Sequence, residues 1–203
     1  NARLVGNPGC YPTATLLGLL PLVELNVIDD CSIIVDGKSG ASGAGREMRS
    51  DLMIAETADN FRAYAGSGHR HGPEMQHQLS NFGSDAVVTF VPHMVPMIRG
   101  IEVTIYVPTD LSVEEARSRY QQRYDADPMI TVISSDEIHP ETRWVRGSNR
   151  CVIGIYQQRS GQLIISSVID NLVKGAAGQA IQNMNLMLRF DETESLVMDS
   201  VSP

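Results

Sequence analysis

The sequence has few cysteines and no long apolar run. Its three cysteines, Cys10, Cys31 and Cys151, are odd in number and irregularly spaced, whereas secreted disulfide domains use paired cysteines in a regular framework. We therefore expect no disulfide and a reducing compartment, the cytoplasm. The most apolar run, residues 14–23, is shorter than the roughly 20 residues that cross a bilayer, and no secretory segment precedes it.

Positive charge is also scarce. The chain has 16 basic and 24 acidic residues, a net charge of -8, which argues against nucleic acid as a partner. Any anionic substrate then has to be bound by local basic residues. A hydrophobic content of 42% in 203 residues is enough for the core of one large domain.

Two further features are missing from the sequence. The chain starts at Asn1 without a methionine, and no G-x-G-x-x-G motif follows a strand pattern, so no dinucleotide-binding fingerprint is present. We expect the chain to be a piece of a longer protein.

Hydrophobic periodicity predicts strands mixed with helices. Strand patterns cover residues 31–35, 86–91, 101–107, 129–133, 151–157 and 163–168, and helical patterns cover 13–25, 72–82, 112–124 and 172–190. The last two strands form a hairpin that turns at Ser160-Gly161. Adjacent hairpin-like pairs predict a mixed, largely antiparallel sheet covered by helices, an α+β (α/β) fold.

The residues around Cys10 carry the clearest chemical signal. Pro8 and Pro12 fix the backbone on either side, and Gly9 permits a close approach that a Cβ would resist. We expect a cysteine on a tight turn at a helix N-terminus, where unpaired N–H groups lower the thiol pKa and can hold an oxyanion. The alternative is a buried cysteine that acts as a small hydrophobic residue.

A cysteine nucleophile needs a group that exchanges protons, and histidine suits that role near neutral pH. His69 and His71 are two residues apart, so both can face one pocket, and Glu74 can orient the His71 ring or share its charge. We favour His71 as the acid and base, but the sequence does not separate it from His69. Metal binding by this pair has no supporting H-E-x-x-H or paired-cysteine spacing, so we predict no metal site. A hydrogen-bonded histidine pair on the surface is the other alternative.

Residues 38–46 form a loop rich in glycine and serine that ends in Arg46. Backbone donors of such a loop, at Ser39, Gly40, Ser42 and Gly43, can approach an anion or a cofactor, and a flexible linker is the alternative. Counter-charges for an anionic substrate are expected in loops near strand ends. The candidates are Arg46, His93, Arg99 and Arg146, whereas Arg62, Arg117, Arg119 and Arg123 are assigned to the surface.

Five segments of the chain, in order, resemble the N-acetyl-gamma-glutamyl-phosphate reductases, relatives of aspartate-semialdehyde dehydrogenase and of glyceraldehyde-3-phosphate dehydrogenase. They are NPGCYPTATLLGLL from Asn7, SGASGAGR from Ser39, HRHGPE from His69, FVPHMVPMIRG from Phe90 and DNLVKGAAGQAIQNMN from Asp170. The resemblance implies the C-terminal domain fold of the glyceraldehyde-3-phosphate dehydrogenases and a homo-oligomer, a dimer or a tetramer.

The resemblance also implies a reaction in arginine biosynthesis. Cys10 would displace phosphate from N-acetyl-gamma-glutamyl phosphate, reduced NADP would deliver hydride to the thioester, and His71 or His69 would move the protons. Asn171 would face the nicotinamide carboxamide. Gly175 and Gly178 would let the last helix approach the cofactor, although helix packing explains each glycine equally well.

The predicted organisation follows from the same resemblance. Residues 1–169 form the catalytic and dimerisation domain, residues 170–190 a helix that packs on an absent N-terminal dinucleotide-binding domain, and residues 191–203 a weakly ordered tail. Three rival interpretations remain open: an aspartate-semialdehyde type of dehydrogenase, a cofactor-independent thiol acyltransferase or hydrolase, and a non-enzymatic assembly module.

Overall fold

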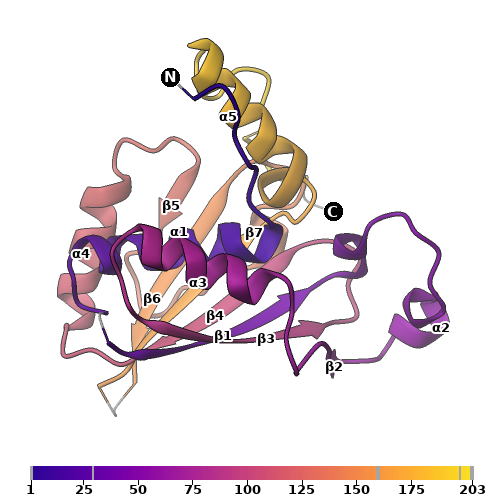
Figure 1. The fold of residues 1–203 in the computed structure, drawn as a ribbon, viewed down its shortest axis with the longest axis horizontal. Coiled ribbons are helices and arrows are strands. Elements are labelled where there is room, and N and C mark those ends of the chain that lie inside the picture. Colours follow the sequence, from indigo (N-terminus) through magenta and orange to yellow (C-terminus); the bar gives the residue numbers. More distant parts are fainter. Residues whose placement is uncertain (1, 29, 159–160, 197, 202–203) are drawn as a thin grey trace.

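A computed structural model describes residues 2–28, 30–158, 161–196 and 198–201, and within these ranges one seven-stranded sheet organises the chain (Figure 1). The strand order is β2-β3-β1-β4-β7-β6-β5. The strands are β1 (Ser32–Ser39), β2 (Arg62–Ala63), β3 (Val87–Met94), β4 (Ile101–Val107), β5 (Ile130–Val132), β6 (Cys151–Gln157) and β7 (Leu163–Ile169). In these residues β1 pairs with β3, and β5 with β6, in parallel, and the other neighbours are antiparallel. The predicted mixed, largely antiparallel sheet is confirmed.

Three helices cover one face of this sheet (Figure 1). The α-helices are α1 (Cys10–Glu24), α2 (Ile54–Thr57), α3 (His71–Asn81), α4 (Val113–Tyr124) and α5 (Gly178–Leu188). Short turns of other helix types are η1 (Ala41–Ala44), η2 (Ser50–Leu52), η3 (Thr142–Trp144) and the π-helix η4 (Val173–Ala177). Helices α1, α3 and α4 pack on the sheet and bury the main core, while α2 lies in an excursion away from it. No helix in the described ranges combines the length and the apolarity that crossing a bilayer requires.

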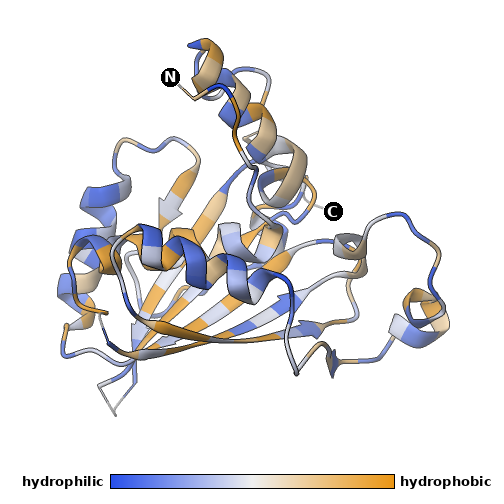
Figure 2. Cartoon of the chain, in the orientation of Figure 1, coloured by the Kyte–Doolittle hydropathy of each residue, from blue (hydrophilic) through white to orange (hydrophobic). Residues whose placement is uncertain are grey.

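Side-chain alternation along β4 shows how the sequence specifies the sheet. Ile101, Val103 and Ile105 are fully buried beneath the helices, whereas Glu102 and Thr104 are half-buried on the opposite face. Hydrophobic and hydrophilic residues accordingly alternate along the strands (Figure 2). A period of two puts one set of side chains on each face, which is why the predicted bounds of this strand match the observed ones.

Two central strands are longer than their apolar runs predicted. β1 continues through residues 36–39, of which 38 and 39 were predicted to start a loop, and β3 continues to Met94. The extension of β1 depends on Gly37, because a Cβ there would lie 2.6 Å from the Tyr11 ring. The strand therefore makes room for an aromatic side chain of α1, a tertiary contact that local sequence does not reveal.

The C-terminal helix α5 projects from the sheet, with the N-terminal segment alongside it (Figure 1). Asn183 donates to the Asn7 side chain at 3.0 Å. Asn185 donates to the carbonyls of Glu192 and Glu194, so the first residues of the predicted weakly ordered tail are bound to α5. Of the predicted hairpin turn, Ser160 lies outside the described residues, and Gly161 has a left-handed φ of 86°.

Candidate active site

Cys10 lies at a helix N-terminus, as the sequence predicted, but α1 begins at Cys10 itself, three residues before the predicted start at residue 13. Gly9 precedes the helix with an extended backbone (φ -67°, ψ 162°). Its N–H donates to the Glu74 carboxylate at 2.8 Å, and its carbonyl accepts from the N–H and Oγ1 of Thr13, both at 2.9 Å. The turn that presents Cys10 is therefore fixed from α3 on one side and from its own helix on the other.

The pKa of Cys10 differs from the expectation. Burial of the thiol raises its pKa above the ordinary value and outweighs the backbone N–H groups of Tyr11 and Cys10, which lower it. Arg70 also lowers this pKa, and Glu74 raises it. The prediction of a lowered pKa is wrong because sequence position does not reveal how far a thiol is withdrawn from water. A protonated thiol needs a neighbouring base before it can act as a nucleophile.

Two imidazoles supply such a base. The rings of His69 and His71 lie edge to face with centroids 4.7 Å apart, and the His71 backbone N–H donates to His69 Nδ1 at 3.1 Å. Burial, followed by the charges of His69 and Arg70, lowers the pKa of His71 to about 4. Burial and Arg70 lower the pKa of His69 as well. Both rings are neutral near pH 7 and can accept a proton.

His71 is the imidazole that contacts the cysteine turn. A Cβ added to Gly9 would meet the His71 ring, 2.8 Å from Cδ2 and closer still to Nε2. The His71 side chain is buried, and its Nδ1 has no hydrogen-bond partner in the described residues. Glu74, predicted to orient this ring, instead accepts from the Gly9 N–H. The ring is therefore held by packing against Gly9, Tyr11 and His69.

Cys10, His69 and His71 line one cavity of about 390 Å³. The same cavity is lined by three arginines, Arg49, Arg62 and Arg70, together with Asp51, Glu47 and the loop residues Ser39, Gly40 and Gly43. Its size suits a small molecule. Within the described residues, no cluster of three or more metal-ligating side chains is present.

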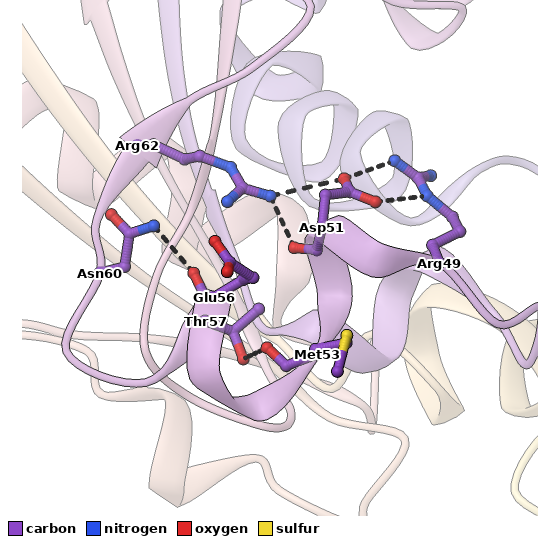
Figure 3. A network of polar contacts seen from close by, with 7 residues as sticks. All are labelled: Arg49, Asp51, Met53, Glu56, Thr57, Asn60 and Arg62. Atoms are coloured by element: carbon purple, nitrogen blue, oxygen red, sulfur yellow. Dashed lines mark hydrogen bonds and ion pairs between the residues drawn. The ribbon is translucent and has the colours of Figure 1, made fainter.

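Two of the arginines are held by one carboxylate (Figure 3). Arg49 donates to both oxygens of Asp51, at 2.7 and 3.0 Å, and Arg62 contacts the Asp51 carboxylate at 3.4 Å and its carbonyl at 2.9 Å. The assignment of Arg62 to the surface is wrong, since it is half-buried and faces the cavity. Sequence reasoning missed all three arginines. The sequence carried a signal for only one of the three, Arg70, which lies between the two histidines.

The four residues predicted to bind substrate lie outside the lining of this cavity. Arg46 is exposed. Arg99 forms an ion pair with the fully buried Asp170 at 2.6 Å, and Arg99 and Arg146 line a separate cavity of about 240 Å³. His93 pairs with Asp36 at 2.9 Å and stacks on the Phe61 ring. Each was chosen for its loop or strand-end position, and this criterion does not identify the face to which a side chain points.

The predicted cofactor residues are brought together only in part. Asn171 donates to Ser42 Oγ at 2.9 Å and accepts from the Gly100 N–H at 2.6 Å, so it joins the glycine-rich loop to the start of β4. A Cβ on Gly43 would lie 3.0 Å from Ser39 Oγ and 3.4 Å from Asn171 Nδ2.

The last two predicted cofactor residues are glycines packed inside the chain. A Cβ on Gly175 would meet the Cβ of Cys10 at 2.7 Å, and a Cβ on Gly178 would meet Asn149 and Val173. The interpretation of these glycines as close-packing positions is therefore the one that the contacts favour.

Comparison with known proteins identifies what the chain is similar to. Residues 10–171 match the family model of the semialdehyde dehydrogenase dimerisation domain. The N-acetyl-gamma-glutamyl-phosphate reductase of Halorhodospira halophila is 50% identical over 198 residues, which cover 96% of this chain and 57% of that protein. The chain thus spans about three fifths of the length of such curated relatives.

Solved structures show the same fold. The crystal structure of aspartate semialdehyde dehydrogenase II from Vibrio cholerae has a TM-score of 0.71 at 18% identity, covering 91% of this chain and 62% of that one. The structure of aspartate semialdehyde dehydrogenase with NADP from Candida albicans has a TM-score of 0.65 at 18% identity, covering 89% and 56%. The predicted fold, that of the C-terminal domain of glyceraldehyde-3-phosphate dehydrogenase-like enzymes, is confirmed.

Proposed function

The chain belongs to the semialdehyde dehydrogenase family through its dimerisation domain, and on this basis we propose that it is the catalytic part of an N-acetyl-gamma-glutamyl-phosphate reductase. We take the substrate, N-acetyl-gamma-glutamyl phosphate, from the name of relatives that are about 50% identical to the chain over nearly its whole length. The observation that carries the proposal is that Cys10, two neutral histidines and three arginines line one cavity.

In the proposed reaction, Cys10 Sγ attacks the acyl carbon of the substrate while His71 Nε2 takes the thiol proton. A C–S bond forms, the bond from the acyl carbon to the phosphate oxygen breaks, and phosphate leaves with the electron pair, so a thioester remains. After reduction of the thioester carbon, its oxygen re-forms the carbonyl as the C–S bond breaks, so the semialdehyde is released and the electron pair of that bond stays on Cys10 Sγ. The His71 imidazolium then returns its proton to the Cys10 thiolate.

NADP is the proposed cofactor, and its reduced form would supply the hydride when bound. The fit of this chain to the nicotinamide end is supported by Ser42, Gly43 and Asn171, because Gly43 leaves space that a Cβ would fill between Ser39 and Asn171. These residues would orient the carboxamide. The backbone N–H groups at the start of α1 would hold the oxyanion that forms at the acyl oxygen.

The substrate brings carboxylate and phosphate charges to an acidic protein. We assign its anionic groups to Arg49 and Arg62, in place of the four residues expected from the sequence. Both guanidiniums line the cavity, and both contact the Asp51 carboxylate, which orients them. A guanidinium that is already oriented loses less conformational entropy when it binds a carboxylate or phosphate.

The domain organisation is also a proposal. Helix α5 projects from the sheet (Figure 1) and leaves large apolar side chains exposed. They are Met184, Leu186, Met187 and Leu188, and they are followed by Phe190. Exposed apolar clusters mark contact surfaces, which supports residues 170–190 as the segment that packs on an N-terminal dinucleotide-binding domain. Residues 1–169 then form the catalytic and dimerisation domain.

Assembly as a homo-oligomer is proposed from the family assignment, and light scattering of the full-length protein tests it. A mass equal to one chain would contradict it. The cytoplasmic location stays a prediction.

The full-length protein tests the function directly. We expect phosphate-dependent reduction of NADP by N-acetyl-glutamate semialdehyde, abolished in Cys10→Ser and retained in the matched variant Cys31→Ser. A thiol hydrolase or acyltransferase would release acid or transfer the acyl group without NADP. Preference for aspartate semialdehyde would identify the other dehydrogenase type. Full activity in Cys10→Ser would show that the reaction does not use this thiol, and an assembly role for this part of the protein would be the remaining interpretation.

A further inference from the structure

Lys174 is a buried cation that the proposed reaction does not use. It lies in the π-helix η4 and is 3% exposed. Its Nζ donates to the Gln182 side-chain carbonyl at 2.6 Å. Burial lowers the pKa of Lys174 and outweighs Cys151, Glu192 and Asp127, which raise it. A neutral amide compensates a buried ammonium poorly. An apolar side chain of similar length would fill the same space at a lower desolvation cost than lysine. The presence of lysine here, bonded to Gln182, therefore needs an explanation.

Gln182 is the centre of a buried polar network. Its side-chain carbonyl also accepts from Asn149 Nδ2 at 3.0 Å, and its Nε2 donates to Glu192 at 2.5 Å. The network therefore joins η4 to helix α5, to the residues just before β6 and to the segment after α5. Buried networks of this kind favour one geometry, and the atom of this one that has no hydrogen-bond partner in the described residues is Asn149 Oδ1.

The next two residues of η4 contact the nucleophile segment. The residue after Lys174 is Gly175, where an added Cβ would lie 2.7 Å from the Cβ of Cys10. The carbonyl of Ala176 accepts from the Asn7 side chain at 3.2 Å. The Gly175 N–H donates to the Asp170 carbonyl at 2.8 Å, five residues back, as in a π-helix. Such local π-turns occur often at functional sites.

We propose that Lys174 is a positioning residue, which through Gln182 holds η4 against Cys10 and so fixes where the nucleophile lies relative to the substrate. The inference rests on the proposed function of Cys10. The effect is positional, since the charges that act on the Cys10 thiol are those of Arg70 and Glu74. Displacing a reacting group by about 1 Å can cost about 10²-fold in rate.

The test uses the full-length protein and two variants that break the same hydrogen bond, Lys174→Met and Gln182→Met. The matched control is Gln179→Met. Gln179 lies on α5, as Gln182 does, and lines a cavity that Lys174 and Gln182 also line, but its side chain donates to Asn183. We expect kcat per alkylatable Cys10 thiol to fall roughly tenfold in both variants with KM within about twofold, and no change in the control. If Lys174 and Gln182 served only to stabilise the fold, the two variants would have fewer alkylatable Cys10 thiols, but kcat per thiol would be unchanged.

A double variant tests the route through η4. If Lys174 acts by holding Gly175, then Lys174→Met and Gly175→Ala lower kcat per thiol for the same reason. Their effects on kcat per thiol will then not add in the double variant. Unchanged kcat per thiol in Lys174→Met and Gln182→Met, an equal loss in Gln179→Met, or additive losses would overturn the inference. A wild-type protein whose Cys10 does not react would instead overturn the proposed function, so the two failures are distinguishable.

Discussion

Gly9→Ala is the sharpest test of how the cavity is built. The backbone of Gly9 suits alanine, so the substitution acts through the added Cβ alone. That Cβ would lie 2.8 Å from Cδ2 of His71, and ordinary contact begins near 3.4 Å. The ring must retreat by about 0.6 Å at this atom and farther at Nε2, toward Tyr11 and His69, which pack around it.

The cost of this change can be estimated from the packing. Overfilling a packed site costs about 1–3 kcal/mol, and the lower entropy of the unfolded alanine chain offsets about 0.4–1 kcal/mol. We expect the free energy of unfolding to fall by about 1–2 kcal/mol. Displacement of the imidazole from the nucleophile should lower kcat by roughly 10- to 100-fold.

Urea denaturation and steady-state kinetics of the full-length protein measure both quantities. The matched control is Gly72→Ala, in the first turn of α3, where an added Cβ meets nothing within 4 Å. This control should gain about 0.5–1 kcal/mol in stability and keep its activity. Equal stability and kcat in Gly9→Ala and the wild type would refute the reasoning, because His71 would then not be packed against the cysteine turn.

Three further predictions follow from the site. Arg62→Ala should raise KM for the substrate by at least about tenfold, since a charge-assisted contact is worth about 1.5–3 kcal/mol, whereas Arg119→Ala, on the exposed face of α4, should leave KM unchanged in the same assay. The pKa of His71 is lowered to about 4 in the folded protein, so as the pH falls the unfolded chain binds a proton at this histidine before the folded chain does. The contribution of His71 to the free energy of unfolding is therefore full above about pH 6.5 and is lost as the pH falls toward 4. His71→Gln should make the free energy of unfolding, measured by denaturation at several pH values, depend less on pH in this range. Asn171→Ala leaves the Gly100 N–H without its acceptor, which should lower the free energy of unfolding by about 1–3 kcal/mol and raise KM for NADP; an unchanged KM would remove Asn171 from the cofactor site.

The sequence predicted elements best where one local rule decided the outcome. Alternation fixed β4, and the Ser112 hydroxyl, which accepts from the Glu115 N–H, fixed the start of α4. The C-terminal part of β1 was missed because Gly37 looks like a loop residue until Tyr11 is placed beside it. Residues 36–39 show no alternation of apolar and polar side chains, so the rule that predicted β4 did not apply to them.

The candidate site divides in the same way. Cys10 and the histidine pair were identified because each stands in a local motif. Arg49 and Arg62 were missed because they reach the cavity through the excursion that contains α2, and the sequence around them carries no turn or capping signal that fixes its path. Glu74 was identified as important but with the wrong partner, since nothing local shows that α3 crosses the start of α1.

The parallel pairing of β1 with β3 also determines when the cavity forms. Residues 40–86 connect these two strands, and they supply the arginines and both histidines. At about 5–20 residues per second, the ribosome finishes β3 several seconds after it has made the cysteine. In the nascent chain, that thiol is therefore left uncovered until the crossover closes, and an oxidant would find it more accessible then than at any time after folding.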